Sequence, residues 1–365
     1  MSELSPHESF RVLHAAVSVT PSLGVIRQME IEASAAKQLK LPWDVCIFSG
    51  RPTQSEIVRT VGSGKRSPIA YLQLRYAFYR WLNQQKNHYQ AILLRYSVHD
   101  AMQAMALHKS PNIWTVHHTL EDAELRGVPG FKGRLLTQLE SHLAKKTLKR
   151  AHGIVSVTNE IAEEQQRRAS IGHSLLYPNG VMYDSAPAED YRGGGLELLF
   201  VAGGLPVWHG IDLLVKEIQS SSYDTRLHLV GPFDAQMLKI RPDDARFVFH
   251  GVLPSNAIRD VAARCDLAIS CLALERKGMF EACPLKVREY LMLGLPVYGG
   301  YMDKSFPSDF PYYRKGPPEL CEMIRFNKSL AKPTRQLVAQ SSRPWIEKTV
   351  LLRRLYDQLQ ACHSP

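Results

Sequence analysis

The chain has 365 residues, too many for one ordinary hydrophobic core, and a usual size of about 150 residues per domain predicts two domains. Hydrophobic residues make up 45%, as in globular proteins, and no apolar run approaches the ~18 residues of a membrane span or forms a signal-peptide core near the N-terminus. A net charge of +10 favours an anionic partner, which would be a nucleic acid, an anionic membrane surface or a phosphorylated substrate.

The first half of the chain alternates short apolar runs with amphipathic stretches, which predicts strands followed by helices. The expected strands are 11–17, 44–48, 91–95, 113–116 and 153–157, and the expected helices are 25–40, 68–86, 135–150 and 159–170. The turn-rich stretch 186–195 then predicts an interdomain linker.

The same alternation resumes after this stretch. The expected strands are 197–202, 226–230, 246–250, 266–271 and 296–298, and the expected helices are 211–220, 255–264, 285–293 and 318–328. Such alternation indicates α/β architecture with two doubly wound, Rossmann-like domains, 1–185 and 196–342, facing across a cleft. An amphipathic helix within 343–365 either closes the second domain or crosses back to the first.

Six cysteines are scattered without the Cys-x-x-Cys spacing of a zinc site or a disulfide framework. Most stand in apolar contexts, so we expect reduced core residues and a cytoplasmic protein. They are Cys46, Cys265, Cys271, Cys283, Cys321 and Cys362.

Segment 64–82 interleaves basic residues with aromatic residues at helical spacing. This pattern is typical of helices that lie in a membrane interface, and equally of a core-facing aromatic stripe with a solvated basic face. No nucleic-acid-binding motif accompanies the charge, so nucleic acid is not the expected partner.

Three loops after expected strands could carry chemistry. Gly24 and the Gly203-Gly204 pair each precede a helix, where a backbone N–H can approach an anion, although turn formation alone also explains these glycines. His209 is placed either to meet a phosphate oxygen or as a structural histidine. His117 and His118 follow strand 113–116 and point to opposite sides, so at most one faces a cleft.

Glu281 and Glu289 bracket the start of the expected helix 285–293. Pro284 suits its first position and Gly294 a left-handed stop, while the open helix N-terminus suits phosphate. The carboxylates would then accept hydrogen bonds from sugar hydroxyls. The alternative is a surface helix with a glutamate at each end. Neither an Asp-x-Asp pair nor a Ser-His-Asp elbow is present in the sequence, so we expect no metal.

Taken in order, these features resemble the family-4 retaining glycosyltransferases of the GT-B fold over nearly the whole chain. The most specific is the Glu-x7-Glu motif from Glu281 to Glu289, continuing as Tyr-Leu-Met-Leu-Gly-Leu-Pro-Val. The others are the strand-loop-helix 199–214, the segments 229–231, 248–251 and 265–270, the Asn-Gly turn in 177–181, and the tail 343–356, which resembles the segment returning to the N-terminal domain.

The resemblance implies a retaining, metal-independent transfer of sugar from a UDP- or GDP-linked donor to a saccharide or lipid-linked acceptor. It also implies envelope or exopolysaccharide biosynthesis, with no cofactor besides the donor substrate. Because the N-terminal domain takes the acceptor in this family, segment 64–82 would meet an anionic membrane at the inner face of the cell membrane.

Carried over to this sequence, Glu289 would hold the ribose hydroxyls, Glu281 would lie near the transferred sugar, and the amides of Leu285 and Lys286 would meet the diphosphate. In the same way, Gly24 would let its loop close on the diphosphate, and His118 would approach the reacting centre. Backbone around Gly251 and Val252 would meet the base.

One departure from the family concerns charge. Where the family commonly has an Arg and a Lys on the diphosphate, this chain has Gly204 and His209. A helix N-terminus supplies about half a charge, so we expect Lys286, with help from Arg276 or Lys277, to supply the rest. The expected catalytic residues are therefore Glu281, His118 and Lys286. Two alternatives stay open: a nucleotide-sugar 2-epimerase of the same fold, and a degenerate glycosyltransferase-like binding or scaffold protein.

Overall fold

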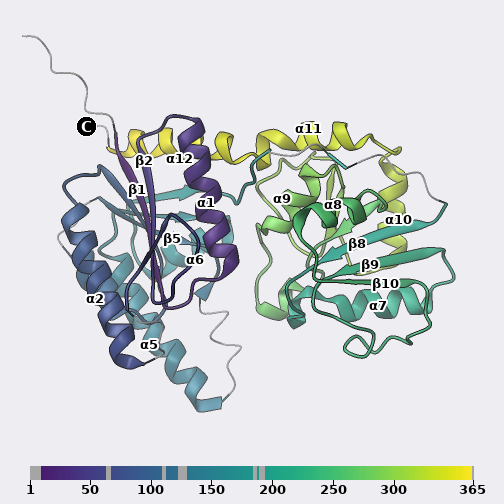
Figure 1. The fold of residues 1–365 in the computed structure, drawn as a ribbon, viewed down its shortest axis with the longest axis horizontal. Helices are drawn as coiled ribbons and strands as arrows, with labels where there is room; N and C mark the ends of the chain where they lie inside the picture. Colours follow the sequence, from purple (N-terminus) through teal and green to yellow (C-terminus); the bar gives the residue numbers. More distant parts are fainter. Residues whose placement is uncertain are drawn as a thin grey trace, which may run out of the picture. The chain divides into compact units, whose positions relative to one another are not determined.

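The computed structural model describes residues 10–62, 67–108, 112–121, 130–183, 187–188 and 194–363 (Figure 1). They form two compact units. The N-terminal unit contains the chain up to Pro178 and again from Lys348 onward, and the C-terminal unit runs from Asn179 to Glu347. The chain thus passes between units before the predicted linker, much of which lies outside the described residues, and returns at 347–348 instead of 342–343.

The N-terminal unit is built on a seven-stranded parallel sheet within the described residues. In sheet order its strands are β3 (Val58–Thr60), β2 (Trp43–Ser49), β1 (Val12–Ser18), β4 (Ala91–Arg95), β5 (Ile113–His117), β6 (Gly153–Ser156) and β7 (His173–Leu176). Its helices are α1 (Leu23–Gln38), α2 (Pro68–Gln85), α3 (Ala101–Ala106), α5 (Gly130–Leu148), α6 (Asn159–Arg168) and α12 (Lys348–His363).

The C-terminal unit repeats this design with a six-stranded parallel sheet in the part of the chain that is described. In sheet order its strands are β10 (Phe247–Gly251), β9 (Thr225–Val230), β8 (Leu196–Val201), β11 (Leu267–Ile269), β12 (Val297–Gly299) and β13 (Tyr313–Lys315). Its helices are α7 (Ile211–Ser220), α8 (Ser255–Ala262), α9 (Leu285–Met292), α10 (Leu320–Ser329) and α11 (Arg335–Ile346).

Alternation along each strand divides the core into two layers. Leu198 and Phe200 of β8 pack with α7 and α10, whereas Leu199, between them, packs with α8, α9 and α11. In the N-terminal unit, Val17 of β1 lies in the cluster with α2, and Ala16 lies in the cluster with α1. Because helices cover both faces, the central strands are apolar on both sides, which is the pattern that predicted them.

The prediction of two doubly wound α/β domains is confirmed, and so is the return of the last helix to the N-terminal unit. Three strands were not predicted: β3, β7 and β13. All three are edge strands whose residues are mostly half-buried or exposed, so they lack the continuous apolar run that identifies a central strand. The short helix α3 was also missed.

The sequence predicted one helix in the tail, but the structure has two. Helix α11 ends at Ile346, Glu347 is extended, and α12 starts at Lys348. The break is held by backbone pairing, because the N–H of Val181 donates to the carbonyl of Ile346 at 2.8 Å. Glu347 also accepts from the guanidinium of Arg343.

A buried carboxylate fastens α12 to the N-terminal unit. Glu32 of α1 accepts from Trp43 at 3.0 Å and Tyr177 at 3.0 Å, and pairs with His14 at 2.7 Å and Lys348 at 3.5 Å. Burial alone would raise its pKa, but the attraction of His14 and Lys348 and these hydrogen bonds lower the pKa of Glu32 to about 2. One side chain therefore joins β1, α1, β2, the segment after β7 and α12.

We predict that Glu32→Gln lowers the free energy of unfolding by about 3 kcal/mol, because it leaves His14 and Lys348 buried beside a neutral amide. The native pKa lies below the unfolded value, so this stability is present above about pH 4.5 and is lost as the pH falls toward 2. Denaturant unfolding at several pH values measures both effects. Glu30→Gln, an exposed change on the same helix, is the matched control and should alter stability by less than about 0.5 kcal/mol. Equal effects of the two substitutions would contradict the role of Glu32.

Candidate functional site

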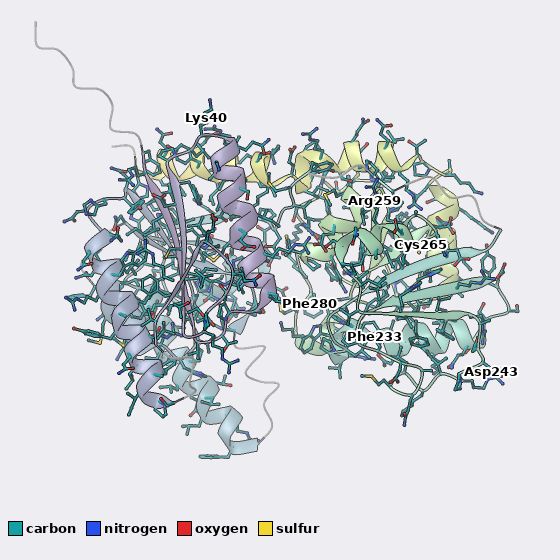
Figure 2. The ribbon with its side chains drawn as sticks, viewed as in Figure 1. Lys40, Phe233, Asp243, Arg259, Cys265 and Phe280 are labelled. Atoms are coloured by element: carbon teal, nitrogen blue, oxygen red, sulfur yellow. The ribbon has the colours of Figure 1, made fainter. Side chains whose placement is uncertain are left out.

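Gly204, His209 and Glu281, three candidate residues of the C-terminal unit, lie on loops that follow β8 and β11. These strands are neighbours at the point where the order of the sheet reverses, and in parallel α/β sheets ligands bind at such a point, beyond the carboxyl ends of the strands. Helix α9, which contains Lys286 and Glu289, follows the second loop. Phe280, labelled in Figure 2, is exposed and immediately precedes Glu281.

The loop after β8 is fastened to the loop after β11. The N–H of Leu272 donates to the carbonyl of His209 at 2.9 Å, and that of Ala273 to Trp208 at 3.3 Å. Gly210 has φ +67°, and a Cβ there would lie 2.9 Å from the Cβ of Leu272. Gly204 differs, since a Cβ there would meet no atom within 4 Å.

The structure brings Lys286 to the loop that contains Gly204 and His209. The Lys286 Nζ lies 4.7 Å from the centroid of the Phe200 ring, and the His209 ring meets the same ring edge-on at 5.6 Å between centroids. The Lys286 Nζ is buried and has no hydrogen-bond partner among the described residues, although part of the Lys286 side chain is exposed. Burial lowers the pKa of Lys286.

His209 does not supply a charge at neutral pH. Burial first, and then the nearby Lys286 ammonium, lower its pKa to about 4, against a smaller opposing effect of a hydrogen bond to the backbone of Gly204. The neutral imidazole can still donate or accept a hydrogen bond. The sequence-based view that Gly204 and His209 leave a charge deficit here agrees with this geometry.

Arg276 and Lys277 were expected to assist Lys286. The Arg276 guanidinium instead forms two hydrogen bonds with Asp212, at 2.8 and 3.0 Å, and a third with the carbonyl of Val207 at 2.9 Å. Lys277 lies over the Trp208 ring at 5.2 Å. The two cations thus have partners in 207–212, and Arg276 is exposed, whereas the Lys286 Nζ is buried.

Helix α9 begins at Leu285, as in the predicted range 285–293, but Pro284 is not its first helical residue. Pro284 is its N-cap, with φ −75° and ψ 144°, and Leu285 is the first helical residue. No side chain caps this end, so the first-turn N–H groups of Leu285 and Lys286 are placed to bind an anion. The hydroxyl of Tyr290, inside α9, accepts from the Val201 N–H at 2.8 Å and so ties α9 to the end of β8. Gly294 ends the helix with φ +83°, as predicted.

Glu281 lies in the loop ahead of α9 and is paired with Lys304, a partner that the sequence did not indicate. Its loop is held by backbone hydrogen bonds to Met302 on both sides. Next to it, the buried Arg288 forms a bidentate ion pair with Asp303 and donates to the carbonyl of Asn179 at 3.1 Å. These contacts fix the Glu281 loop relative to α9.

The other donor-site candidates are consistent with ligand access. Glu289 is half-buried on α9. Gly251 ends β10 with φ +67°, its carbonyl accepts from the Gly231 N–H at 2.8 Å, and Val252 after it is 75% exposed.

In the N-terminal unit, Gly24 and His118 lie at the carboxyl ends of β1 and β5. Gly24 is exposed in the first turn of α1, which Ser22 caps through the Val25 N–H at 3.3 Å. His117 is committed to structure, with Nδ1 2.8 Å from Glu121 and Nε2 3.1 Å from Thr115. His118, in contrast, has no such hydrogen bonds among the described residues. Both of its ring nitrogens are buried without a hydrogen-bond partner among the described residues, and burial, then Arg95 and His14, lower its pKa well below the usual value.

Phe200, Lys304 and Asp303 were not predicted as parts of the site. Phe200 contacts Lys286, Lys304 pairs with Glu281, and Asp303 pairs with Arg288. The two residues of each pair are distant in the sequence and share no motif, so no signal in the sequence pointed to these contacts. Among the described residues, the only group of three or more possible metal ligands is Glu319, Cys321 and Glu322, which is largely exposed at the start of α10 and contains none of the site residues.

Residues 35–183 match the sequence model of the family described as Glycosyltransferase Family 4. This segment, which is less than half of the chain, is therefore a glycosyltransferase family 4 domain. The domain identifies the protein as an enzyme of the transferase class and confirms the resemblance inferred from the motifs. Comparison with curated proteins gave no match.

Solved structures share the fold of this glycosyltransferase over almost its whole length. A glycosyltransferase from Rickettsia africae ESF-5 has a TM-score of 0.68 at 14% identity, covering 98% of this chain and 99% of that one. Anabaena Alr3699/HepE, solved in complex with UDP and glucose, has a TM-score of 0.63 at 12% identity and covers 96% and 100%. A putative UDP-N-acetylglucosamine 2-epimerase from Listeria monocytogenes has a TM-score of 0.52 at 11% identity and covers 96% of each. At these identities the likeness establishes the fold alone.

We predict that Gly210→Ala destabilises this glycosyltransferase by about 1–3 kcal/mol, because a non-glycine residue is strained at positive φ and its Cβ would crowd Leu272 and Ala273. Gly204→Ala is the control in the same loop and should leave stability nearly unchanged, since its Cβ meets open space. Denaturant unfolding checks both. Equal destabilisation by the two substitutions would show that the loop is not held as described.

Proposed function

We propose that the protein is a retaining, metal-independent glycosyltransferase. It would take a sugar from a nucleotide diphosphate sugar and transfer it to a saccharide or lipid-linked acceptor, in envelope or exopolysaccharide biosynthesis. The solved complex of the Anabaena protein with UDP and glucose supports a UDP-linked donor, since it shares this fold.

The observation that carries the proposal is the buried ammonium of Lys286 at the uncapped start of α9. A buried cation without a hydrogen-bond partner is unfavourable unless an anion joins it. The N–H groups of Leu285 and Lys286 and the positive end of the helix dipole belong to the same helix start, so this end of α9 suits a diphosphate. Lys286 would thereby replace the cations that the family commonly places at the positions of Gly204 and His209.

In the proposed reaction, the bond from the anomeric carbon to the diphosphate oxygen breaks first, and its electron pair leaves with the diphosphate. Lys286 and the α9 N–H groups stabilise the negative charge that develops there. The acceptor hydroxyl then bonds to the anomeric carbon on the same face, and its proton passes to the departing diphosphate. The scheme needs no side-chain base; Glu281 would orient sugar hydroxyls, and His118 would approach the reacting centre with a neutral imidazole.

The acceptor is proposed to reside at the cytoplasmic face of a membrane. The support is the basic segment 64–82, most of which forms α2. Phe78 and Tyr79 are buried in the core, as the core-facing alternative predicted, whereas Tyr76 is exposed. No helix in the described part of the chain is both long and apolar enough to cross a bilayer. The proposed association is therefore peripheral.

We expect a matching nucleotide sugar to raise the thermal unfolding midpoint in the presence of EDTA, because a bound donor stabilises the native state and needs no metal here. A screen of UDP, GDP and ADP sugars measures this effect. Glu289→Ala should reduce the shift by removing the ribose contact. A shift that appears only when a divalent metal is added would contradict the metal-free site.

We predict that Lys286→Ala lowers kcat by ~10²-fold or more, as for other electrostatic groups on a developing charge. Lys277→Ala, a nearby cation outside the proposed diphosphate site, should change kcat by less than about threefold. Adding Gly204→Arg to Lys286→Ala should restore part of the loss, because the position is open and would regain the cation common in the family. Initial rates of sugar transfer in EDTA provide the measurement.

The pH dependence has a defined sign. Only the protonated Lys286 attracts a diphosphate, so donor affinity should fall as the pH rises through its lowered pKa, and this fall should be absent in Lys286→Ala. Full activity of Lys286→Ala at all pH values would show that the charge comes from elsewhere.

The scaffold alternative is favoured by one observation, the neutral His209 in a loop that has lost both family cations. Slow hydrolysis of the donor in the absence of acceptor would favour a glycosyltransferase over a scaffold protein, because a binding protein does not break the bond between the sugar and the diphosphate. Analysis of the released sugar also separates a transferase from a 2-epimerase.

A further inference from the structure

Helix α2 has an exposed apolar stripe that the transfer reaction does not use. Ile69, Leu72 and Tyr76 lie at helical spacing on one face, and the first of these is 69% exposed. Arg80, one turn after Tyr76, continues the same face and is exposed. The opposite face of α2, with Leu74 and Phe78, is buried in the core.

Helix α5 has a second stripe of the same kind. Phe131, Leu135 and Leu139 are spaced four residues apart, and Phe131 is 81% exposed. Lys146, seven residues after Leu139, falls on this face and is exposed. Each stripe is therefore apolar in the first part of its helix and cationic toward its end.

The two stripes belong to one surface. Helix α3 packs against both α2 and α5 and adds Met105, which is 71% exposed. Figure 1 shows α2 and α5 on the same side of the N-terminal sheet. We call the seven apolar residues with Arg80 and Lys146 the α2–α3–α5 face.

Negative charge is missing from this face. Helices α2 and α3 contain no Asp or Glu. The single carboxylate of α5, Glu140, is buried, where it accepts from Tyr96 at 2.5 Å and from the His99 N–H at 2.6 Å. Exposed apolar side chains among cations, with no exposed carboxylate on the three helices, match an anionic lipid surface and would repel no part of it.

The position of the face suits a membrane-bound acceptor. In a parallel α/β unit, each crossover helix begins near the carboxyl edge of the sheet. The apolar parts of α2 and α5 are their first halves, so they lie toward the edge at which Gly24 and His118 follow their strands.

We propose that the α2–α3–α5 face is the surface by which the protein docks on an anionic bilayer. The apolar side chains enter the interface while Arg80 and Lys146 meet anionic headgroups. The inference deepens the proposed function by naming the docking surface, but the docking step itself needs no donor and no catalysis.

The test is co-flotation of the full chain with vesicles of phosphatidylcholine alone or with added phosphatidylglycerol, at low and high salt. We expect binding to the anionic vesicles at low salt and weaker binding at high salt. The variant Leu72→Ser/Phe131→Ser/Leu135→Ser should bind about tenfold less or weaker still, and Arg80→Ser/Lys146→Ser should lose the preference for anionic vesicles.

The matched control is Met237→Ser/Leu337→Ser, which removes two exposed apolar side chains of the C-terminal unit and should bind as the wild type does. Thermal unfolding shows whether each variant is folded. If the serine variants of the face do not fold, Arg80→Ser/Lys146→Ser alone decides, since both side chains are exposed.

Several outcomes would overturn the inference: no co-flotation of the wild type, equal binding to neutral and anionic vesicles, or unchanged binding of the face variants. If the wild type is a dimer in solution and the triple-serine variant a monomer, the face is covered by a second copy and the docking proposal fails. The thermal shift with donor is measured on the same samples. A donor shift without flotation refutes only the docking, and flotation without a donor shift refutes only the proposed reaction.

Discussion

The site in the C-terminal unit depends on one buried positive charge. The Lys286 ammonium is removed from water, packs over the Phe200 ring and has no hydrogen-bond acceptor in the described chain. Burial lowers the pKa of Lys286, and burial, followed by the charge of Lys286, lowers the pKa of the neighbouring His209. The elements around it are arranged to keep it there: Tyr290 holds α9 against β8, and the 207–210 turn is bonded to the loop after β11. The unit therefore holds an unfavourable charge where a diphosphate would make it favourable.

The N-terminal unit treats buried charge in the opposite way. Glu32 is more completely buried than Lys286, but four groups from different segments surround it. Its pKa therefore falls, although burial alone would raise it. Charge that is fully compensated stabilises a fold, and here it attaches α12 to the sheet that the chain left at Pro178. Charge that lacks a partner is available to a ligand. The same contrast appears in the two vicinal histidines, since both ring nitrogens of His117 are hydrogen-bonded, whereas neither nitrogen of His118 has a partner among the described residues.

Most central strands and several helix starts could be predicted from the sequence, because they depend on local patterns of apolar and polar residues. Central strands such as β1 and β8 are apolar on both faces, and α2, α7 and α9 start within a residue of the predicted position. Edge strands β3, β7 and β13 were missed, because a strand with one free edge and a half-exposed face needs no apolar run. The break at Glu347 was missed for a different reason: it depends on Val181, which is far away in the sequence.

Periodicity and short motifs such as Glu281 to Glu289 were enough to predict the two α/β domains, the resemblance to a family and the residue types available for chemistry. Tertiary structure alone decided which of these residues lie together. Asp212 pairs with Arg276, Lys304 pairs with Glu281, and Lys286 lies over the Phe200 ring. The His209 ring contacts the same Phe200 ring. Ion pairing, burial and the loss of water that shifts a pKa are set by contacts between segments distant along the chain. Spacing along the chain does not encode those contacts, which is why the role of each charge emerged only from the folded protein.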